Sequence, residues 1–205
     1  MYQVLIADDH PLFRAALIGS LAEMDLKFDI SESSTFDEAR QHILNNDMDL
    51  LLLDLRMPGN EGLLGLLSLR SEFPELAIVV VSANEDPQTI SDAKDMGAMG
   101  FIPKSSKRDD IHQGLTRVLD GEFSFPEFTK PDEASDVACK LNLLTPKQLK
   151  VLHMIGKGDL NKQIAYNLNI KETTVKTHIS DILRKLEITN RTQAALILKE
   201  LSVVE

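Results

Sequence analysis

Short apolar runs recur along the first part of the chain, and they constrain the fold more than any other feature. The clearest are QVLIA, DLLLLDL, AIVVVSA and MGFIP. Their apolar residues do not alternate with polar ones, so both sides of each segment need cover from water. Strands of this kind are typical of a parallel sheet packed between two layers of helices.

Amphipathic segments separate these expected strands. They lie at about residues 11–24, 36–46, 62–72, 87–96 and 107–120. Pro11 and Pro87 mark two helix starts, because proline suits a first helical turn. With KFDISES as a second strand, the pattern predicts five strand–helix units in an open, doubly wound α/β sheet of five parallel strands.

The formal charge changes sign along the chain. Residues 1–122 hold 22 Asp and Glu against 10 Lys and Arg, a net charge of −12, whereas residues 139–205 hold 6 against 11, a net charge of +5. An acidic front joined to a basic tail predicts two domains with different partners, the basic one a candidate for nucleic acid.

Periodicity lapses from about residue 121 to 143, and helical patterns return beyond it in LTPKQLKVLHMIGKG, NKQIAYNLNI, ETTVKTHISDILRKLEI and NRTQAALILKEL. We therefore expect an α/β domain at residues 1–121, a linker at 122–141 and an all-α domain of four helices at 142–205.

Cysteine content and hydropathy bound the cellular context. The single Cys139 excludes an intramolecular disulfide framework and a thiolate zinc site, and it fits a reducing compartment. No apolar run approaches the ~18 residues of a membrane span, and no basic segment with an apolar stretch opens the chain. We expect a cytoplasmic protein with no membrane partner.

Polar residues directly follow four of the five expected strands. They are Asp8 and Asp9 after the first strand, Asp54 after the third, Ser82 after the fourth and Lys104 after the fifth. Taken singly, such residues are usually helix caps or solvated side chains. Ligands of doubly wound sheets, however, bind beyond the carboxyl ends of the strands, so five such residues at one edge predict a site.

Three carboxylates, a hydroxyl and an ammonium suit a hard cation beside a phosphoryl acceptor. Magnesium prefers oxygen ligands, often one or two carboxylates with waters and phosphate oxygens, and Asp9 and Asp54 can supply the carboxylates. A carboxylate can also attack phosphorus to form an acyl phosphate. The cation, Lys104 and the Ser82 hydroxyl would then meet the charge on the transferred group.

The motifs ADDH, LLLDLRMPG, VVVSA and GFIPKS, in this order and spacing, resemble those of the receiver domain of bacterial two-component response regulators over about residues 2–121. The resemblance implies a flavodoxin-like fold, Mg²⁺ as cofactor and a histidine kinase as phosphoryl donor. It implies that Asp54 is the phosphoacceptor. It also implies that Asp9 binds magnesium directly, Asp8 mainly through water, and Arg56 through its backbone carbonyl.

The same resemblance implies a switch pair, Ser82 and Phe101, in which the hydroxyl turns toward the phosphoryl group and the ring rotates inward behind it. Lys104 matches the lysine that contacts the phosphoryl oxygens. Two positions depart from the common pattern: Ser105 follows Lys104 where many receivers have proline, and Phe101 lacks the hydroxyl of the commoner tyrosine.

One expected helix of the tail has two distinct faces. Its apolar stripe consists of Val175, Ile179, Ile182, Leu183 and Leu186. The opposite face carries Thr173, Thr177, Ser180 and Arg184, with Lys176 on its flank. A polar face is usually only solvated, but the preceding short helix, NKQIAYNL, supplies a helix-turn-helix context in which such a face enters a major groove.

The tail as a whole is similar to the four-helix DNA-binding domain of LuxR-type regulators over about residues 142–203, and with a receiver in front it resembles the NarL subgroup. The resemblance implies double-stranded DNA as a partner, and a homodimer at least when phosphorylated or bound to DNA. It implies that bases are approached by Lys176, Thr177 and Ser180. It implies that phosphates are held by Lys162, Thr173, Thr174, Arg184 and Lys185.

Asp181 stands where asparagine is expected in this resemblance. An acid facing DNA is unfavourable near phosphates, although it can accept a hydrogen bond from cytosine N4. The sequence favours the alternative, an ion pair with Lys185 four residues further along the helix.

Two other functions stay open at this point. The first is a magnesium-dependent phosphohydrolase that turns over an aspartyl phosphate. It needs a general acid, often the second Asp of a D-x-D pair, and Arg56 at that position disfavours turnover beyond slow autodephosphorylation. The second is a regulator that partner binding activates without phosphate.

Overall fold

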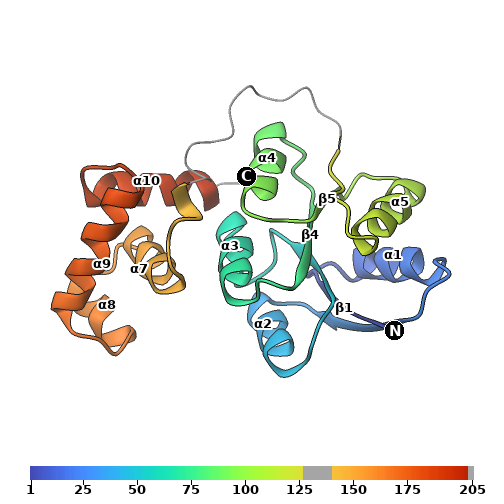
Figure 1. Cartoon of the computed structure of the whole chain (residues 1–205), viewed down its shortest axis with the longest axis horizontal. Helices are drawn as coiled ribbons and strands as arrows, with labels where there is room; N and C mark the ends of the chain where they lie inside the picture. Colours follow the sequence, from blue (N-terminus) through green and yellow to red (C-terminus); the bar gives the residue numbers. More distant parts are fainter. Residues whose placement is uncertain (127–139, 203–205) are drawn as a thin grey trace. The chain divides into compact units, whose positions relative to one another are not determined.

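A computed structural model describes residues 1–126 and 140–202. The chain divides into two compact units, and each described range belongs to one of them. The N-terminal unit contains five parallel strands in the order β2-β1-β3-β4-β5, which confirms the expected doubly wound sheet (Figure 1). The strands are β1 (Tyr2–Ala7), β2 (Phe28–Ser33), β3 (Leu50–Asp54), β4 (Ala77–Ser82) and β5 (Gly100–Pro103).

Helices cover both faces of this sheet, as the apolar strands require. They are α1 (Pro11–Ala22), α2 (Phe36–Asn45), α3 (Leu63–Glu72), α4 (Pro87–Asp95) and α5 (Arg108–Leu119). In Figure 1, α1 and α5 lie on one side of the sheet and α2, α3 and α4 on the other. Ile6 and Leu52 pack with Leu17 of α1 and Leu115 of α5. Leu51, the neighbour of Leu52 in β3, points to the opposite face of the sheet and is also fully buried.

The strand register brings the carboxyl ends of neighbouring strands to one level. Ala7 lies opposite Leu53, Asp54 opposite Val81, and Ser82 opposite Pro103. Asp8, Asp54, Ser82 and Lys104, which lie at or just after these strand ends, therefore lie along the same edge of the sheet. This alignment builds the edge that the sequence predicts as a site.

The chain returns to the sheet after α5. Ser124 forms an isolated parallel bridge with Gly100 of β5. This residue lies in the stretch expected to be a linker, 122–141, most of which falls outside the described residues.

The C-terminal unit contains α7 (Pro146–Gly156), α8 (Asn161–Asn167), α9 (Glu172–Lys185) and α10 (Arg191–Ser202). The helices expected at these positions are confirmed. Thr145 and Gln148 form a reciprocal capping box at the start of α7. Between α8 and α9, Asn169 adopts φ 52°, which turns the chain sharply enough for a helix-turn-helix arrangement.

Within residues 1–126 and 140–202, no helix combines the length and the apolar character that crossing a membrane requires.

Replacing Ile182 by alanine should destabilise the C-terminal unit. Ile182 of α9 is completely buried, and removing such a side chain leaves a cavity that costs roughly 2–5 kcal/mol. Amide hydrogen exchange along α9 in the whole chain measures this loss, with Leu196→Ala, at an exposed position of α10, as the control. Unchanged protection of α9 in Ile182→Ala would contradict the packing described here.

Candidate functional site

The ammonium of Lys104 joins the ends of three strands. Its Nζ lies 2.8 Å from Asp8 Oδ2 and 2.8 Å from Asp54 Oδ2, and both aspartates are only 1% exposed. Two carboxylates buried this close would repel strongly, and the ammonium between them offsets that repulsion. The structure thus brings together Asp8, Asp54 and Lys104, which lie far apart in the sequence.

Two opposing effects act on the pKa of Lys104. Burial of the Lys104 ammonium acts to lower its pKa, but the hydrogen bonds that it donates to Asp54 and Asp8, together with their negative charge, outweigh burial and raise the pKa above its usual value. The ring of Phe13 lies 5.2 Å from the ammonium, a distance at which the aromatic face attracts a cation. Lys104 therefore stays positively charged at physiological pH.

Backbone and amide groups fix Asp54. Its Oδ1 accepts the Arg56 N–H at 2.9 Å, and its carbonyl accepts the Asn60 side-chain amide at 2.8 Å. The Asn60 amide has room only because residue 65 is glycine: a Cβ there would lie 1.8 Å from Asn60 Oδ1. The sequence did not single out Asn60, whose signal is only its place in the loop after Asp54.

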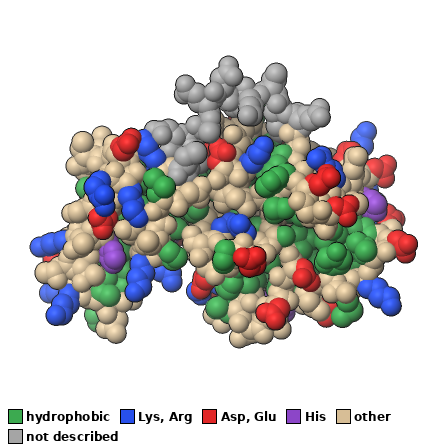
Figure 2. Space-filling model, viewed as in Figure 1, with side chains coloured by type: hydrophobic (Ala, Val, Ile, Leu, Met, Phe, Trp, Pro, Cys, Tyr) green, Lys and Arg blue, Asp and Glu red, His purple; other side chains and the backbone are tan. Residues whose placement is uncertain are grey.

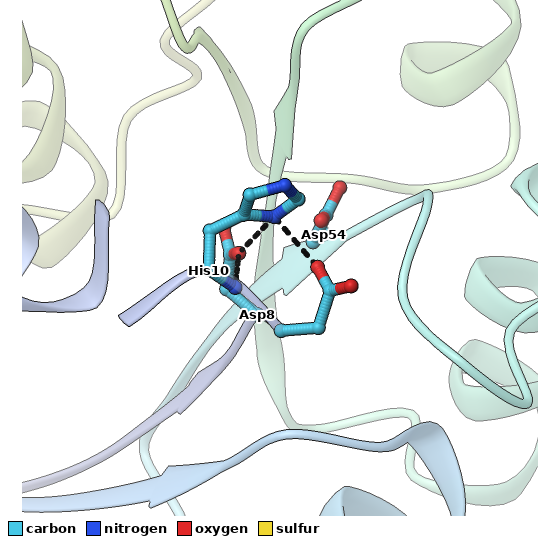
Figure 3. Close-up of side chains that lie close together, drawn as sticks. Asp8, His10 and Asp54 are labelled. Carbon is cyan, nitrogen blue, oxygen red and sulfur yellow. Dashed lines mark hydrogen bonds and ion pairs between the residues drawn. The ribbon is translucent and has the colours of Figure 1, made fainter. Parts of the chain in front are cut away.

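His10 is a second residue of this edge that the sequence reasoning missed. Asp8 Oδ1 accepts the His10 backbone N–H at 2.7 Å, and the ring Nδ1 lies 3.2 Å from the same oxygen (Figure 3). The ring Nδ1 also lies 2.6 Å from Asp9 Oδ1. Its position directly after the two aspartates was the available signal.

The carboxylates at this edge fit a hard divalent cation. Ligand atoms of Asp8, Asp9, His10 and Asp54 all lie within 4.8 Å of one another. Three of these residues offer carboxylate oxygens, which Mg²⁺ prefers. The Arg56 N–H donates to Asp54, while the role of the Arg56 carbonyl as a ligand stays a prediction.

Ser82 and Phe101 are buried on the same face of the sheet. Ser82 is fully buried at the end of β4, and its Oγ accepts the Asn84 N–H at 3.1 Å. Its own hydroxyl hydrogen is thus left to donate. Phe101 lies opposite Val80 in the register and is also buried. Because side chains alternate along β4, Val80, Ser82 and Phe101 share one face.

Most residues expected to contact nucleic acid are exposed. They are Lys162 on α8 and Thr173, Thr174, Lys176, Thr177, Ser180 and Arg184 on α9. Figure 2 shows Lys and Arg side chains gathered over α7 to α10. On the inner side of α9, Val175, Ile182 and Leu186 are buried. The separation of an apolar stripe from a polar face is therefore present in the structure.

Lys185 differs from this group. Its ammonium lies 2.7 Å from the Leu143 carbonyl and 2.8 Å from Gln148 Oε1. The expected pair between Asp181 and Lys185 is wrong: Asp181 instead pairs with Arg184 at 3.0 Å. The reason is that Gln148 and the Leu143 carbonyl, near the start of α7, attract the Lys185 ammonium away from its own helix.

Known proteins resemble this chain along almost its whole length. A family model described as the response regulator receiver domain matches residues 4–116, and one described as bacterial regulatory proteins of the luxR family matches residues 142–198. The chain is 44% identical over 211 aligned positions to a glycerol metabolism activator of Pseudomonas putida, covering 96% of this chain and 94% of that protein.

Two further similarities span nearly the full length. The chain is 32% identical over 203 positions to the nitrate/nitrite response regulator protein NarL of Escherichia coli K12, covering 94% and 93% of the two proteins. It is also similar to a solved structure of two RcsB dimers bound to two parallel DNAs, with 25% identity, a TM-score of 0.58 and 99% of both chains covered.

Removing the His10 ring should weaken magnesium binding. The ring Nδ1 of His10 lies close to one oxygen of Asp8 and one of Asp9, so the ring supports the position of both carboxylates, and losing such a supporting contact typically lowers metal affinity by roughly 10–100-fold. Calorimetric titration of Mg²⁺ into the full-length His10→Leu variant measures the loss. His10→Asn, whose amide can donate from near the Nδ1 position, should retain most of the affinity. Equal affinities in wild type and His10→Leu would refute an orienting role.

Proposed function

Because the chain belongs to the response regulators that join a receiver domain to a LuxR-type DNA-binding domain, we propose that it is a transcription regulator switched by phosphorylation of Asp54. A histidine kinase supplies the phosphoryl group, and Mg²⁺ is required. The receiver occupies residues 1–121, a linker residues 122–141 and the DNA-binding domain residues 142–205. The observation that carries this proposal is the Lys104 ammonium shared by Asp54 and Asp8.

Each residue at this edge of the sheet has a separate role in the transfer of the phosphoryl group. An oxygen of the Asp54 carboxylate attacks phosphorus, the bond from phosphorus to the donor histidine breaks, and an acyl phosphate forms. The Arg56 N–H holds Asp54 Oδ1, so the carboxylate meets the donor in one orientation. Lys104 and the Ser82 hydroxyl donate to the phosphoryl oxygens.

Bound Mg²⁺ would neutralise charge on the phosphoryl oxygens. Asp9 and Asp54 would ligate it directly, Asp8 through water, and Arg56 through its carbonyl. Asp8 and Asp9 are pre-oriented for this by His10.

The DNA-binding domain would use α9 as its recognition helix. Lys176, Thr177 and Ser180 approach base edges, while phosphates are held by Lys162, Thr173, Thr174 and Arg184. The family resemblance also implies a phosphate contact for Lys185, but its contacts with Leu143 and Gln148 favour a structural role. The solved RcsB dimers on DNA support binding as a homodimer to paired half-sites, spaced by about one helical turn or a multiple of it.

Asp54→Asn should abolish labelling of the protein by radioactive acetyl phosphate in the presence of Mg²⁺, because an amide cannot attack phosphorus. Asp120→Asn, an exposed carboxylate beyond the end of α5, serves as the control and should label normally. Label retained in Asp54→Asn would overturn the site assignment. Release of many equivalents of phosphate per chain would favour the phosphohydrolase instead.

Beryllofluoride, a phosphoryl mimic, should raise the affinity of the whole chain for its operator. Coupling between two sites of this kind is typically 5–150-fold, and we expect roughly that range here. Quantitative DNA binding with and without beryllofluoride and Mg²⁺ measures it. An affinity that does not change would favour a regulator activated by partner binding alone.

Two lysines of the DNA-binding domain should respond differently to salt. Lys162→Ala should reduce the slope of log affinity against log salt by about 1, because one phosphate contact is lost. Lys185→Met should leave the slope unchanged and lower the thermal stability of the domain, since its ammonium bonds to Leu143 and Gln148. Equal reductions in slope would assign both lysines to phosphates.

A further inference from the structure

The segment after α5 adds a short parallel strand beside β5. The Ser124 N–H donates to the Met99 carbonyl at 3.0 Å, and the Phe101 N–H donates to the Ser124 carbonyl at 2.9 Å. β5 would otherwise present the backbone groups of a sheet edge. The residue bonded to Ser124 is Phe101, the ring of the switch pair.

Two glycines make room for this segment. A Cβ at Gly100 would lie 2.8 Å from the Ser124 carbonyl oxygen, and a Cβ at Gly114 would lie 3.2 Å from Ser124 Oγ. Gly114 stands inside α5, where glycine is an unfavourable choice unless close approach requires it. Two separate elements thus accommodate the same residue.

The aromatic residues on either side of Ser124 reach a third element. The rings of Phe123 and Phe125 stack with centroids 6.4 Å apart, and the Lys94 ammonium of α4 lies 5.6 Å from the Phe125 centroid. Residues 123–125 therefore contact α4 and β5 and lie against α5. α4 is the helix that follows Ser82 in the chain, and β5 directly precedes Lys104.

The strand β5 connects Ser124 to the acidic edge. This edge is the set of strand-end residues Asp8, Asp9, Asp54, Ser82 and Lys104. Lys104 directly follows β5, and its N–H donates to the Ser82 carbonyl at 2.7 Å. Its ammonium lies against Oδ2 of Asp54. A phosphoryl group on that carboxylate displaces the ammonium from its present position. Any resulting shift of the strand acts on Phe101, whose N–H is fixed to Ser124.

We propose that Ser124 is a positioning residue of the phosphorylation switch: its backbone pairing holds β5 in the unphosphorylated arrangement and loosens when Asp54 is phosphorylated. Residues 123–125 lead toward the DNA-binding unit, so this pairing transmits the state of the site to that unit. The inference rests on the proposed phosphorylation of Asp54 and on the switch role that the family resemblance implies for Phe101. It adds that the backbone pairing between Ser124 and β5 links the phosphorylation state of Asp54 to the segment after α5.

Amide hydrogen exchange of the full chain tests the loosening directly. With beryllofluoride and Mg²⁺ bound, the amides of Phe101 and Ser124 should exchange at least about tenfold faster, whereas the amides of buried β1 should not change. Binding of beryllofluoride is followed separately by fluorine NMR. Bound beryllofluoride with unchanged exchange overturns this inference alone, and failure of beryllofluoride to bind overturns the proposed function and this inference with it.

Ser124→Pro and Ser124→Ala form a matched pair for the coupling. Proline removes the N–H that bonds to Met99, whereas alanine keeps the backbone pairing and removes only the hydroxyl. In Ser124→Pro the ratio of DNA affinities with and without beryllofluoride should fall toward 1, because the free chain already binds tightly. Ser124→Ala should keep the wild-type ratio. A wild-type ratio in Ser124→Pro overturns the proposal, provided that the amides of β1 keep their wild-type exchange protection and thereby show an intact receiver fold.

Discussion

The ammonium of Lys104 is the contact on which the acidic edge depends. Asp8 and Asp54 are almost completely buried, and two such carboxylates would repel each other strongly without a positive charge between them. The same contact ties β5 to β1 and β3, which are not its neighbours in the sheet. One side chain therefore offsets part of the negative charge of the site and joins the outer strand to the middle of the sheet.

The residues around this contact come from two parts of the sheet. Carboxylates from β1 and β3 form the part of the edge suited to a cation, while Ser82, Phe101 and Lys104 come from β4 and β5. The half of the sheet that carries β4 and β5 is also where Ser124 pairs with the strand. β5 therefore contacts Ser124 through Phe101 and leads directly into Lys104, whose ammonium bonds to Asp54.

Much of the fold and the main site residues could be predicted from the sequence, because they follow from local patterns. Apolar runs locate the strands, and strand ends locate Asp8, Asp54 and Lys104. His10, Asn60 and Ser124 could not be found this way, since their roles depend on which atoms point at one another after folding. Lys185 shows the same limit: helical spacing suggested Asp181 as its partner, but acceptors 37 and 42 residues away in the sequence bind it instead.

The register of β1 against β3 has a consequence for folding. Asp8 and Asp54 directly continue a pairing in which Ala7 lies opposite Leu53. A slip of one residue would turn the side chains of a strand to the opposite face, and Asp8 would then lose the ammonium that compensates its burial. The charged residues that we propose serve phosphorylation thus also penalise misaligned pairing of the central strands, so the charge of the site helps to select the correct sheet.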